Sequence, residues 1–206
     1  ETSARKHKMK LLRETIRKLI LQEGMITADQ LPDGVMIRIK GRSKSAKIEY
    51  VRSDDRQIQF FPTYPTEEDP HSWGSIKIEK YSWPNNIPVW EVLEARAGQG
   101  YGPLLYDIAM EYATENGLGL MSDRVSVSDE AVGVWDYYLQ NRVGKDVKAH
   151  QMDDMKNTLT DTDDDNNNQH ISKKLAKANW PDHPTSKRYT KAPTTLEALG
   201  NKVIYV

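Results

Sequence analysis

Arg96-Ala-Gly-Gln-Gly-Tyr-Gly-Pro-Leu-Leu-Tyr-Asp-Ile-Ala-Met-Glu-Tyr-Ala113 carries three glycines within five residues. The apolar run Val89 to Ala95 before them predicts a strand. The spacing of apolar residues from Leu104 to Ala113 predicts a helix, which Pro103 opens and Gly117 closes. Glycines between a strand and a helix let the backbone approach an anion closely, at a helix end that attracts negative charge. The stretch therefore predicts a phosphate-binding loop, although a plain strand-to-helix turn stays open.

The spacing of the glycines narrows the kind of phosphate site. No Gly-Lys-Ser/Thr follows the loop, so it is not a P-loop. Gly98-x-Gly100-x-Gly102 also differs from the GxGxxG fingerprint of dinucleotide-binding folds, which opens the helix of a βαβ unit.

Alternating apolar and polar residues predict several strands ahead of the loop. Short turn sequences separate them, which is typical of an antiparallel meander. The predicted strands centre on Val35–Lys40, Ile48–Arg52, Ile58–Phe61 and Ile76–Ile78.

The chain after the loop alternates helices and strands. A strand is predicted over 118–127, a helix over 129–141 with Ser128 or Asp129 as its N-cap, and a strand over 143–152. Lys202-Val-Ile-Tyr-Val206 predicts a last strand, expected to pair with 143–152. The fold class is therefore α/β, with a mixed, mostly antiparallel central sheet.

Two charged segments flank this domain of residues 25–152. Residues 1–24 form a basic leader and an amphipathic helix, and residues 1–18 carry a formal charge of +5. This helix could dock on its own domain, on a partner or on a membrane. Residues 153–200 form a polar insertion whose part 153–165 carries −5, either a solvated loop or a contact surface. Residues 201–206 return to the sheet.

Composition excludes several classes of protein. There is no cysteine, so disulfides, cysteine-based zinc sites and a cysteine nucleophile are excluded. The net charge of −1 argues against a dedicated nucleic-acid binder. Apolar runs are too short for a transmembrane helix, and we expect a soluble, cytoplasmic protein. Its histidines, His7, His71, His150, His170 and His183, show no metal-ligand spacing, and no metal is expected.

The order of meander, glycine loop, helix, strand, helix and later strands resembles the GNAT superfamily of N-acetyltransferases. Its members bind acetyl-CoA through a loop of the form Arg/Gln-x-x-Gly-x-Gly/Ala. Gly100 and Gly102 match the two small positions, whereas Ala97 stands at the Arg/Gln position with Arg96 one residue early. The resemblance implies acetyl-CoA as co-substrate, an amine as acceptor, and a sheet splayed at its centre.

The next block, from Asp123 to Trp135, is similar to the family's Asn-x-x-Ala-x-x-Leu-Tyr. Ser128 stands at the Asn position, and Trp135 stands where the family has the tyrosine that protonates the CoA thiolate. Trp cannot perform that step, so Tyr138 or Tyr137 could replace it, with core packing as the alternative role. The resemblance gives these cofactor-binding residues: Gly98, Gln99, Gly100, Tyr101, Gly102, Pro103, Ser128 and Arg124. Arg124 could also bind an acidic acceptor or form a surface ion pair.

Acyl transfer to an amine also needs a base. Glu91 and Glu94 lie on the strand before the loop, where regular alternation puts them on opposite faces. Glu94 is the favoured base because it is nearer the strand end, although either residue could be a solvated carboxylate.

Two functions follow from the sequence. The first is an acetyl-CoA-dependent N-acyltransferase in which the amine attacks directly. The second is a catalytically silent GNAT-fold structural or interaction protein. Together with Gln99, the block from Asp123 to Trp135 also resembles GNAT-like proteins of tailed bacteriophages. With this second function, the chain could be a virion component or act in the host cytoplasm. Its assembly would use residues 1–24 and 153–195.

Overall fold

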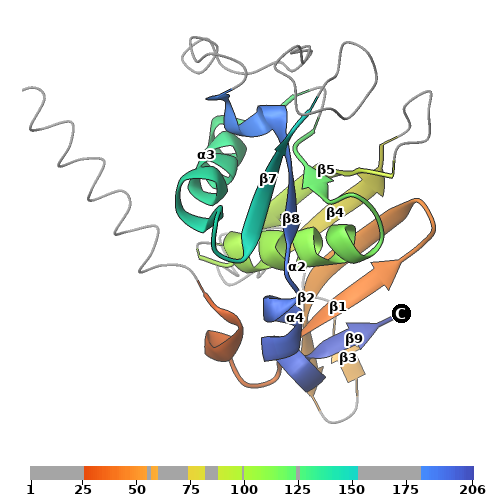
Figure 1. The fold of residues 1–206 in the computed structure, drawn as a ribbon. Coiled ribbons are helices and arrows are strands. Elements are labelled where there is room, and N and C mark those ends of the chain that lie inside the picture. Colours follow the sequence, from red (N-terminus) through yellow and green to blue (C-terminus); the bar gives the residue numbers. More distant parts are fainter. Residues whose placement is uncertain are drawn as a thin grey trace, which may run out of the picture.

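The chain has a mixed α/β fold built on one sheet (Figure 1). A computed structural model describes the following parts of the chain: residues 26–54, 57–59, 74–81, 88–98, 100–123, 126–152 and 182–206.

Nine strands in the described residues form this sheet, in the order β7-β8-β6-β5-β4-β2-β1-β9, with β3 paired to β2. Two neighbouring pairs are parallel, β5 with β6 and β1 with β9, and the remaining pairs are antiparallel. The strands are β1 (Val35–Gly41), β2 (Ser45–Asp54), β3 (Gln57–Gln59), β4 (Gly74–Lys80), β5 (Trp90–Ala97), β6 (Leu120–Met121), β7 (Val147–Gln151), β8 (Lys187–Lys191) and β9 (Val203–Tyr205).

Helix α2 crosses the sheet between the parallel strands β5 and β6 (Figure 1). The α-helices of the described residues are α2 (Gly102–Glu115), α3 (Asp129–Tyr137) and α4 (Thr194–Leu199). Short helical turns are η1 (Ala28–Gln30), the π-helical η2 (Tyr138–Arg142), η4 (Pro184–Ser186) and η5 (Gly200–Lys202). Within these parts of the chain, each helix is too short or too polar to cross a bilayer.

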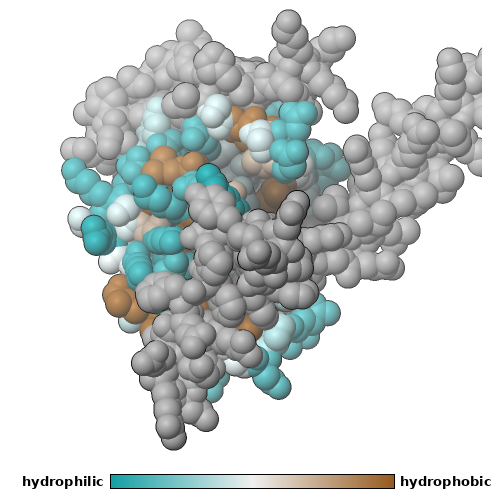
Figure 2. All heavy atoms as spheres, turned by 180° about the vertical axis from the view of Figure 1, so that it is seen from behind, coloured by the Kyte–Doolittle hydropathy of each residue, from teal (hydrophilic) through white to brown (hydrophobic). Residues whose placement is uncertain are grey.

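The two faces of the sheet differ in chemistry. Toward α2, Ile39, Ile48 and Ile76 occupy one cross-strand row and are fully buried. On the opposite face, a row of charged residues crosses four strands, namely Lys40, Lys47, Lys77 and Glu94. Seen from behind, the described residues are largely hydrophilic (Figure 2). The main core therefore lies between α2 and the isoleucine face.

The sequence analysis identified several elements correctly. The meander β1, β2 and β4 leads into β5, and α2 starts at Gly102 after the glycine loop. Ser128 is the N-cap of α3, because its Oγ accepts a hydrogen bond from the N–H of Ala131 at 3.3 Å. The predicted basic helix within residues 1–24 lies outside the described residues.

The prediction that the terminal strand pairs with residues 143–152 was wrong. Residues 203–205 pair in parallel with β1 at one edge of the sheet, whereas β7 pairs with β8 at the other. The prediction failed because it treated residues 153–200 as an insertion without a strand. Lys187-Arg-Tyr-Thr-Lys191 holds one apolar residue, Tyr189, yet it forms β8 between β6 and β7.

Gly119, between α2 and β6, has φ +107°, and a Cβ there would lie 2.4 Å from the carbonyl oxygen of Tyr189. We predict that Gly119→Ala lowers the free energy of unfolding by at least about 2 kcal/mol, because both the backbone conformation and the contact are unfavourable. Gly133 in α3 has open space around its Cα, so Gly133→Ala should raise stability by roughly 0.5–1 kcal/mol. Urea unfolding of both variants tests this, and equal effects would contradict it.

Candidate functional site

The two parallel strands at the centre of the sheet pair over a short stretch in the described residues. β5 and β6 pair through Trp90 with Leu120 and Glu91 with Met121. β6 ends there, while β5 continues to Ala97 with β4 as its paired neighbour among the described strands. Ligands of open α/β sheets bind beyond the carboxyl ends of parallel strands, so this end of β5 is a candidate ligand site.

A β-bulge lies on β5 at the point where it leaves β6. Ile78 of β4 pairs with Val92. The next pair joins Lys77 to Glu94, which leaves Leu93 as an extra residue in β5. Bulges bend a strand and change the direction of the side chains that follow. Between Glu91 and the glycine loop, β5 therefore contains a bulge and makes no pair with β6 in the described residues.

The bulge also changes the relation of the two candidate bases. Glu91 pairs with Glu79 and Glu94 pairs with Lys77, and these two partners are separated by one residue on β4. Residues two apart on a strand share a face, so Glu91 and Glu94 lie on the same face of the sheet. The expectation of opposite faces was wrong because it assumed a regular strand.

Hydrogen bonds from Tyr101, Ile26 and Tyr50 hold the carbonyl groups of the glycine loop. The carbonyl of Gly98 accepts from the N–H of Tyr101 at 3.1 Å, and that of Gly100 accepts from the N–H of Ile26 at 3.0 Å. The carbonyl of Tyr101 accepts from the hydroxyl of Tyr50 at 2.7 Å. Gly100 has φ +85°, a conformation that favours glycine. These contacts fix the path of the loop by its carbonyl side.

The N–H groups of the loop at Gly100 and Gly102 differ from its carbonyl groups in their hydrogen bonding. Within the described part of the chain, no acceptor is bonded to the N–H of Gly100 or Gly102. Helix α2 begins without a side-chain cap and without an acidic residue in its first turn. A helix end of this kind combines N–H donors with positive partial charge. The loop can therefore donate hydrogen bonds to an anion such as a phosphate group.

The candidate bases lie beside this loop on β5. Glu94 forms an ion pair with Arg96, Oε1 to Nε at 2.6 Å, and both side chains are half-exposed. Glu91 is partly buried next to the last paired residue of β6, Met121. The structure places both carboxylates on the strand that leads to the loop, so their proposed role stays a prediction.

Trp135 of α3 and Tyr138, the first residue of η2, are core residues. Trp135 is buried, stacks on Tyr189 with ring centroids 5.2 Å apart, and meets Tyr106 edge-on. Tyr138 is fully buried, and its hydroxyl lies 2.7 Å from Oδ1 of Asp107 and 3.2 Å from the carbonyl oxygen of Pro103. Burial raises the pKa of Tyr138 well above its usual value, and the Asp107 carboxylate adds to this effect. The hydroxyl of Tyr138 thus contacts the backbone of the first turn of α2.

The remaining predicted residues divide into two groups. Ser128 uses its hydroxyl oxygen to cap α3. Gln99 and Arg124 lie outside the described residues. Five predicted residues therefore lie together at the loop and the start of α2: Gly98, Gly100, Tyr101, Gly102 and Pro103. The hydroxyl of Tyr138 contacts the carbonyl oxygen of Pro103.

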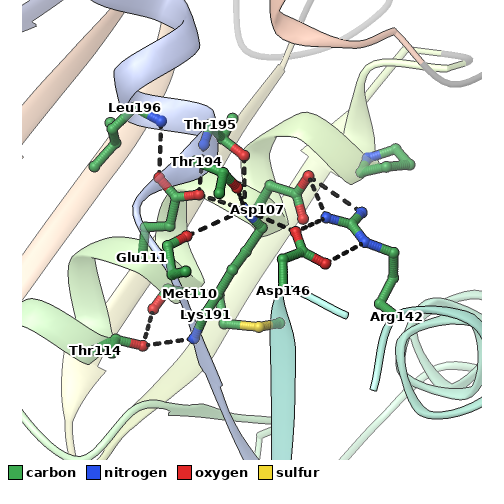
Figure 3. A network of polar contacts seen from close by, with 12 residues as sticks. Asp107, Met110, Glu111, Thr114, Arg142, Asp146, Lys191, Thr194, Thr195 and Leu196 are labelled. Carbon is green, nitrogen blue, oxygen red and sulfur yellow. Dashed lines mark hydrogen bonds and ion pairs between the residues drawn. The ribbon is translucent and has the colours of Figure 1, made fainter. Parts of the chain in front are cut away.

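A buried ion pair fixes α2 on its other side (Figure 3). Nζ of Lys191 on β8 contacts Oε1 of Glu111 on α2, and both side chains are fully buried. The Glu111 carboxylate also accepts from the backbone N–H groups of Thr195 at 2.7 Å and Leu196 at 2.8 Å, in the first turn of α4. The hydroxyl of Thr194 accepts from Nζ of Lys191 at 2.7 Å. One carboxylate thus pairs with β8 and caps α4.

A second group of charges extends this network toward the loop (Figure 3). Nε of Arg142 donates to Oδ1 of Asp146 at 3.0 Å, and Nη1 of Arg142 lies 3.4 Å from Oδ2 of Asp107. Asp146 is also 3.3 Å from Nζ of Lys191. The hydrogen bond from Arg142 lowers the pKa of Asp146 to about 2, whereas burial raises the pKa of Asp107.

Sequence reasoning missed three contributors to this arrangement: Tyr50, Asp107 and Glu111. Tyr50 fits the alternating pattern of a strand, and no neighbouring residue in the sequence indicates that its hydroxyl contacts the loop. Asp107, Glu111 and Thr114 are spaced at helical intervals on an otherwise apolar helix, and all three make buried or half-buried polar contacts. That polar stripe was the available signal for a buried network.

Three comparisons of the chain with known proteins found no match: no protein family, no curated protein and no solved structure matches it. In the described ranges, no cluster of three or more His, Asp or Glu side chains is arranged to hold a metal ion.

The Asp146 ion pairs predict a specific dependence of stability on pH. The folded pKa of about 2 lies below the usual 3.8, so the contribution is complete above about pH 4 and is lost as the pH falls to 2. We predict that Asp146→Asn costs about 2 kcal/mol of unfolding free energy at pH 6, with the difference from wild type shrinking toward pH 2.

Thermal or urea unfolding between pH 6 and pH 2 measures this difference. Asp33→Asn is the control, because Asp33 is an exposed carboxylate on the turn before β1 and its replacement should change stability by less than about 0.5 kcal/mol. A pH-independent difference for Asp146→Asn would show that the ion pairs contribute nothing.

Proposed function

We propose that the chain is an acetyl-CoA-dependent N-acyltransferase of the GNAT type, acting on an amine. The observation that carries this proposal is the position of the glycine loop. The loop follows the end of β5, whose pairing with β6 stops at Glu91, and it leads into helix α2, which begins without a side-chain cap.

The sheet supports the GNAT assignment through its order of strands. An antiparallel meander leads into β5, α2 crosses to the parallel strand β6, and the β7–β8 pair completes that side of the sheet. The resemblance implied a mixed sheet splayed at its centre, with the pantetheine arm beside the strand before the loop. Pairing between β5 and β6 that stops at Glu91 and Met121 agrees with that expectation.

The loop supports a pyrophosphate ligand. Its carbonyls accept hydrogen bonds from Tyr101, Ile26 and Tyr50, whereas the N–H groups of Gly100 and Gly102 have no acceptor among the described residues and lie at the N-terminal end of α2, which carries positive partial charge. The loop lacks the Arg or Gln of the family at Ala97, so the backbone would supply most of the phosphate contacts in this chain.

The transfer step needs one base near the acceptor. The amine nitrogen attacks the thioester carbonyl carbon, a C–N bond forms, the C–S bond breaks, and CoA leaves as the thiolate. Glu94 would take the proton that the amine loses, and solvent would return a proton to the thiolate. Glu94 is half-exposed on β5 and therefore accessible to an acceptor, whereas Tyr138 is too deeply buried to protonate the thiolate without rearrangement.

Calorimetric titration with acetyl-CoA tests the binding half of the proposal. We expect a dissociation constant on the order of 1–100 μM, in the usual range of KM values. Gly100→Ala should weaken binding at least about tenfold, because a Cβ at this position strains the loop where the phosphates approach. Gly144→Ala is the matched control, because Gly144 has the same φ of +85° in a turn beside β7.

Two results would contradict this half of the proposal. One is the absence of heat at high micromolar concentrations of folded wild-type protein. The other is equal weakening of acetyl-CoA binding in Gly100→Ala and Gly144→Ala, which would mean that backbone strain alone lowers affinity.

Thiol release from acetyl-CoA in the presence of primary amines tests the catalytic half. Polyamines, aminoglycosides and lysine peptides sample the acceptor class. We expect Glu94→Gln to lower kcat by about 10²–10⁴-fold with unchanged affinity for acetyl-CoA, the range for loss of a general base. Glu115→Gln, at the exposed end of α2, should keep full activity. Full activity of Glu94→Gln would remove Glu94 from the mechanism.

A binding protein without transfer activity is the second candidate, and three contacts favour it. Glu94 is paired with Arg96, the Tyr138 hydroxyl is bonded to Asp107, and Trp135 is packed in the core at the position of the family's acid. Acetyl-CoA binding without thiol release for any amine would favour this candidate. It would then act through assembly, for which residues 1–24 and 153–195 remain the proposed contacts.

A further inference from the structure

We infer that the hydroxyl of Tyr50 is a positioning group for the loop's N–H donors, and that it sets their strength as well as their direction. The inference rests on the proposed binding of acetyl-CoA at the loop of residues 98–102. Tyr50 lies on β2 and is 51 positions away in sequence from the residue it contacts, Tyr101.

The contact is a short, partly buried hydrogen bond. The Tyr50 hydroxyl donates to the carbonyl oxygen of Tyr101 at 2.7 Å, and Tyr50 is 4% exposed. The rings of Tyr50 and Tyr101 meet edge to face with centroids 5.4 Å apart. The contact therefore anchors the residue immediately before α2 to the centre of the sheet.

The carbonyl of Tyr101 and the N–H of Gly102 belong to one peptide group. A hydrogen bond accepted by the carbonyl polarises that group and strengthens the N–H as a donor, by about 10–30% per bond in a chain of hydrogen bonds. Gly102 is the first residue of α2, and its N–H has no acceptor among the described residues. Tyr50 thus acts on an anion through the peptide bond that joins Tyr101 to Gly102.

Tyr138 is placed similarly but its proton goes elsewhere. Its hydroxyl is 3.2 Å from the carbonyl of Pro103 and 2.7 Å from Asp107. A hydroxyl has one proton, and the closer carboxylate is the stronger acceptor when ionised. Of these two buried tyrosines, Tyr50 is therefore the one whose proton is directed at the loop.

The test compares Tyr50→Phe with Tyr189→Phe in the full chain. Tyr189 is the matched control because it is fully buried and its hydroxyl donates to the carbonyl of Pro184, also at 2.7 Å. Each substitution removes one buried hydroxyl and leaves the ring. Stability should therefore fall by similar amounts, and any difference in ligand binding belongs to the loop.

Two readouts separate positioning from general stability. We expect Tyr50→Phe to raise the dissociation constant of CoA about 3- to 10-fold, the worth of one net hydrogen bond, and to leave that of pantetheine, which lacks the phosphates, unchanged. In the ligand-free protein, the amide proton resonance of Gly102 should move upfield in Tyr50→Phe and stay in place in Tyr189→Phe.

The outcomes distinguish this inference from the proposed function. Wild-type protein that does not bind CoA overturns the proposed function and this inference with it. Binding by wild type with equal CoA constants in the two variants overturns the inference alone. An equal loss of CoA and pantetheine affinity in Tyr50→Phe, or an unmoved Gly102 resonance, overturns it as well.

Discussion

The packing of helix α2 against the sheet depends on the buried ion pair between Glu111 and Lys191. It joins α2 to β8, and the same carboxylate caps α4 through the N–H groups of Thr195 and Leu196. Removing one partner of such a buried pair typically costs about 3–5 kcal/mol, because the other charge is left without compensation. The β8 strand lies between β6 and β7, and α4 leads to β9 at the far edge of the sheet. Both ends of the sheet are therefore linked to one helix.

Helix α2 in turn carries the candidate site on its first turn. Its position is set by the ion pair on one side and by the contacts of Tyr50 and Tyr138 with its N-terminal end on the other. β5 and β6 are thereby connected through a fixed helix although they pair at only two positions. A loop whose carbonyls are held in this way would offer its N–H donors to a ligand without rearrangement. Such preorganisation lowers the cost of binding.

Local signals in the sequence predicted the elements that depend on local chemistry. Alternation gave the meander, glycines and Pro103 located the loop and the start of α2, and Ser128 was recognised as a cap. Features that depend on distant partners were missed or wrong. The sequence of β8 is too polar to predict an inner strand. It can lie inside the sheet because the charge of Lys191 is compensated by Glu111, which is far away in sequence. The bulge at Leu93, which puts Glu91 and Glu94 on one face, has no signature in the alternation of β5. The resemblance put Trp135 at the position of the family's tyrosine and suggested Tyr138 as its replacement, but the neighbours of both residues in the core are distant in sequence.

A crystal structure of the protein with CoA tests the central claim most directly. The account predicts pyrophosphate oxygens at hydrogen-bonding distance, about 2.7–3.2 Å, from the N–H groups of Gly100 and Gly102. It also predicts that the pantetheine chain runs beside β5 beyond Glu91, where β6 has ended. CoA bound at another place on the molecule, or crystals grown at saturating CoA with no ligand at the start of α2, would contradict it.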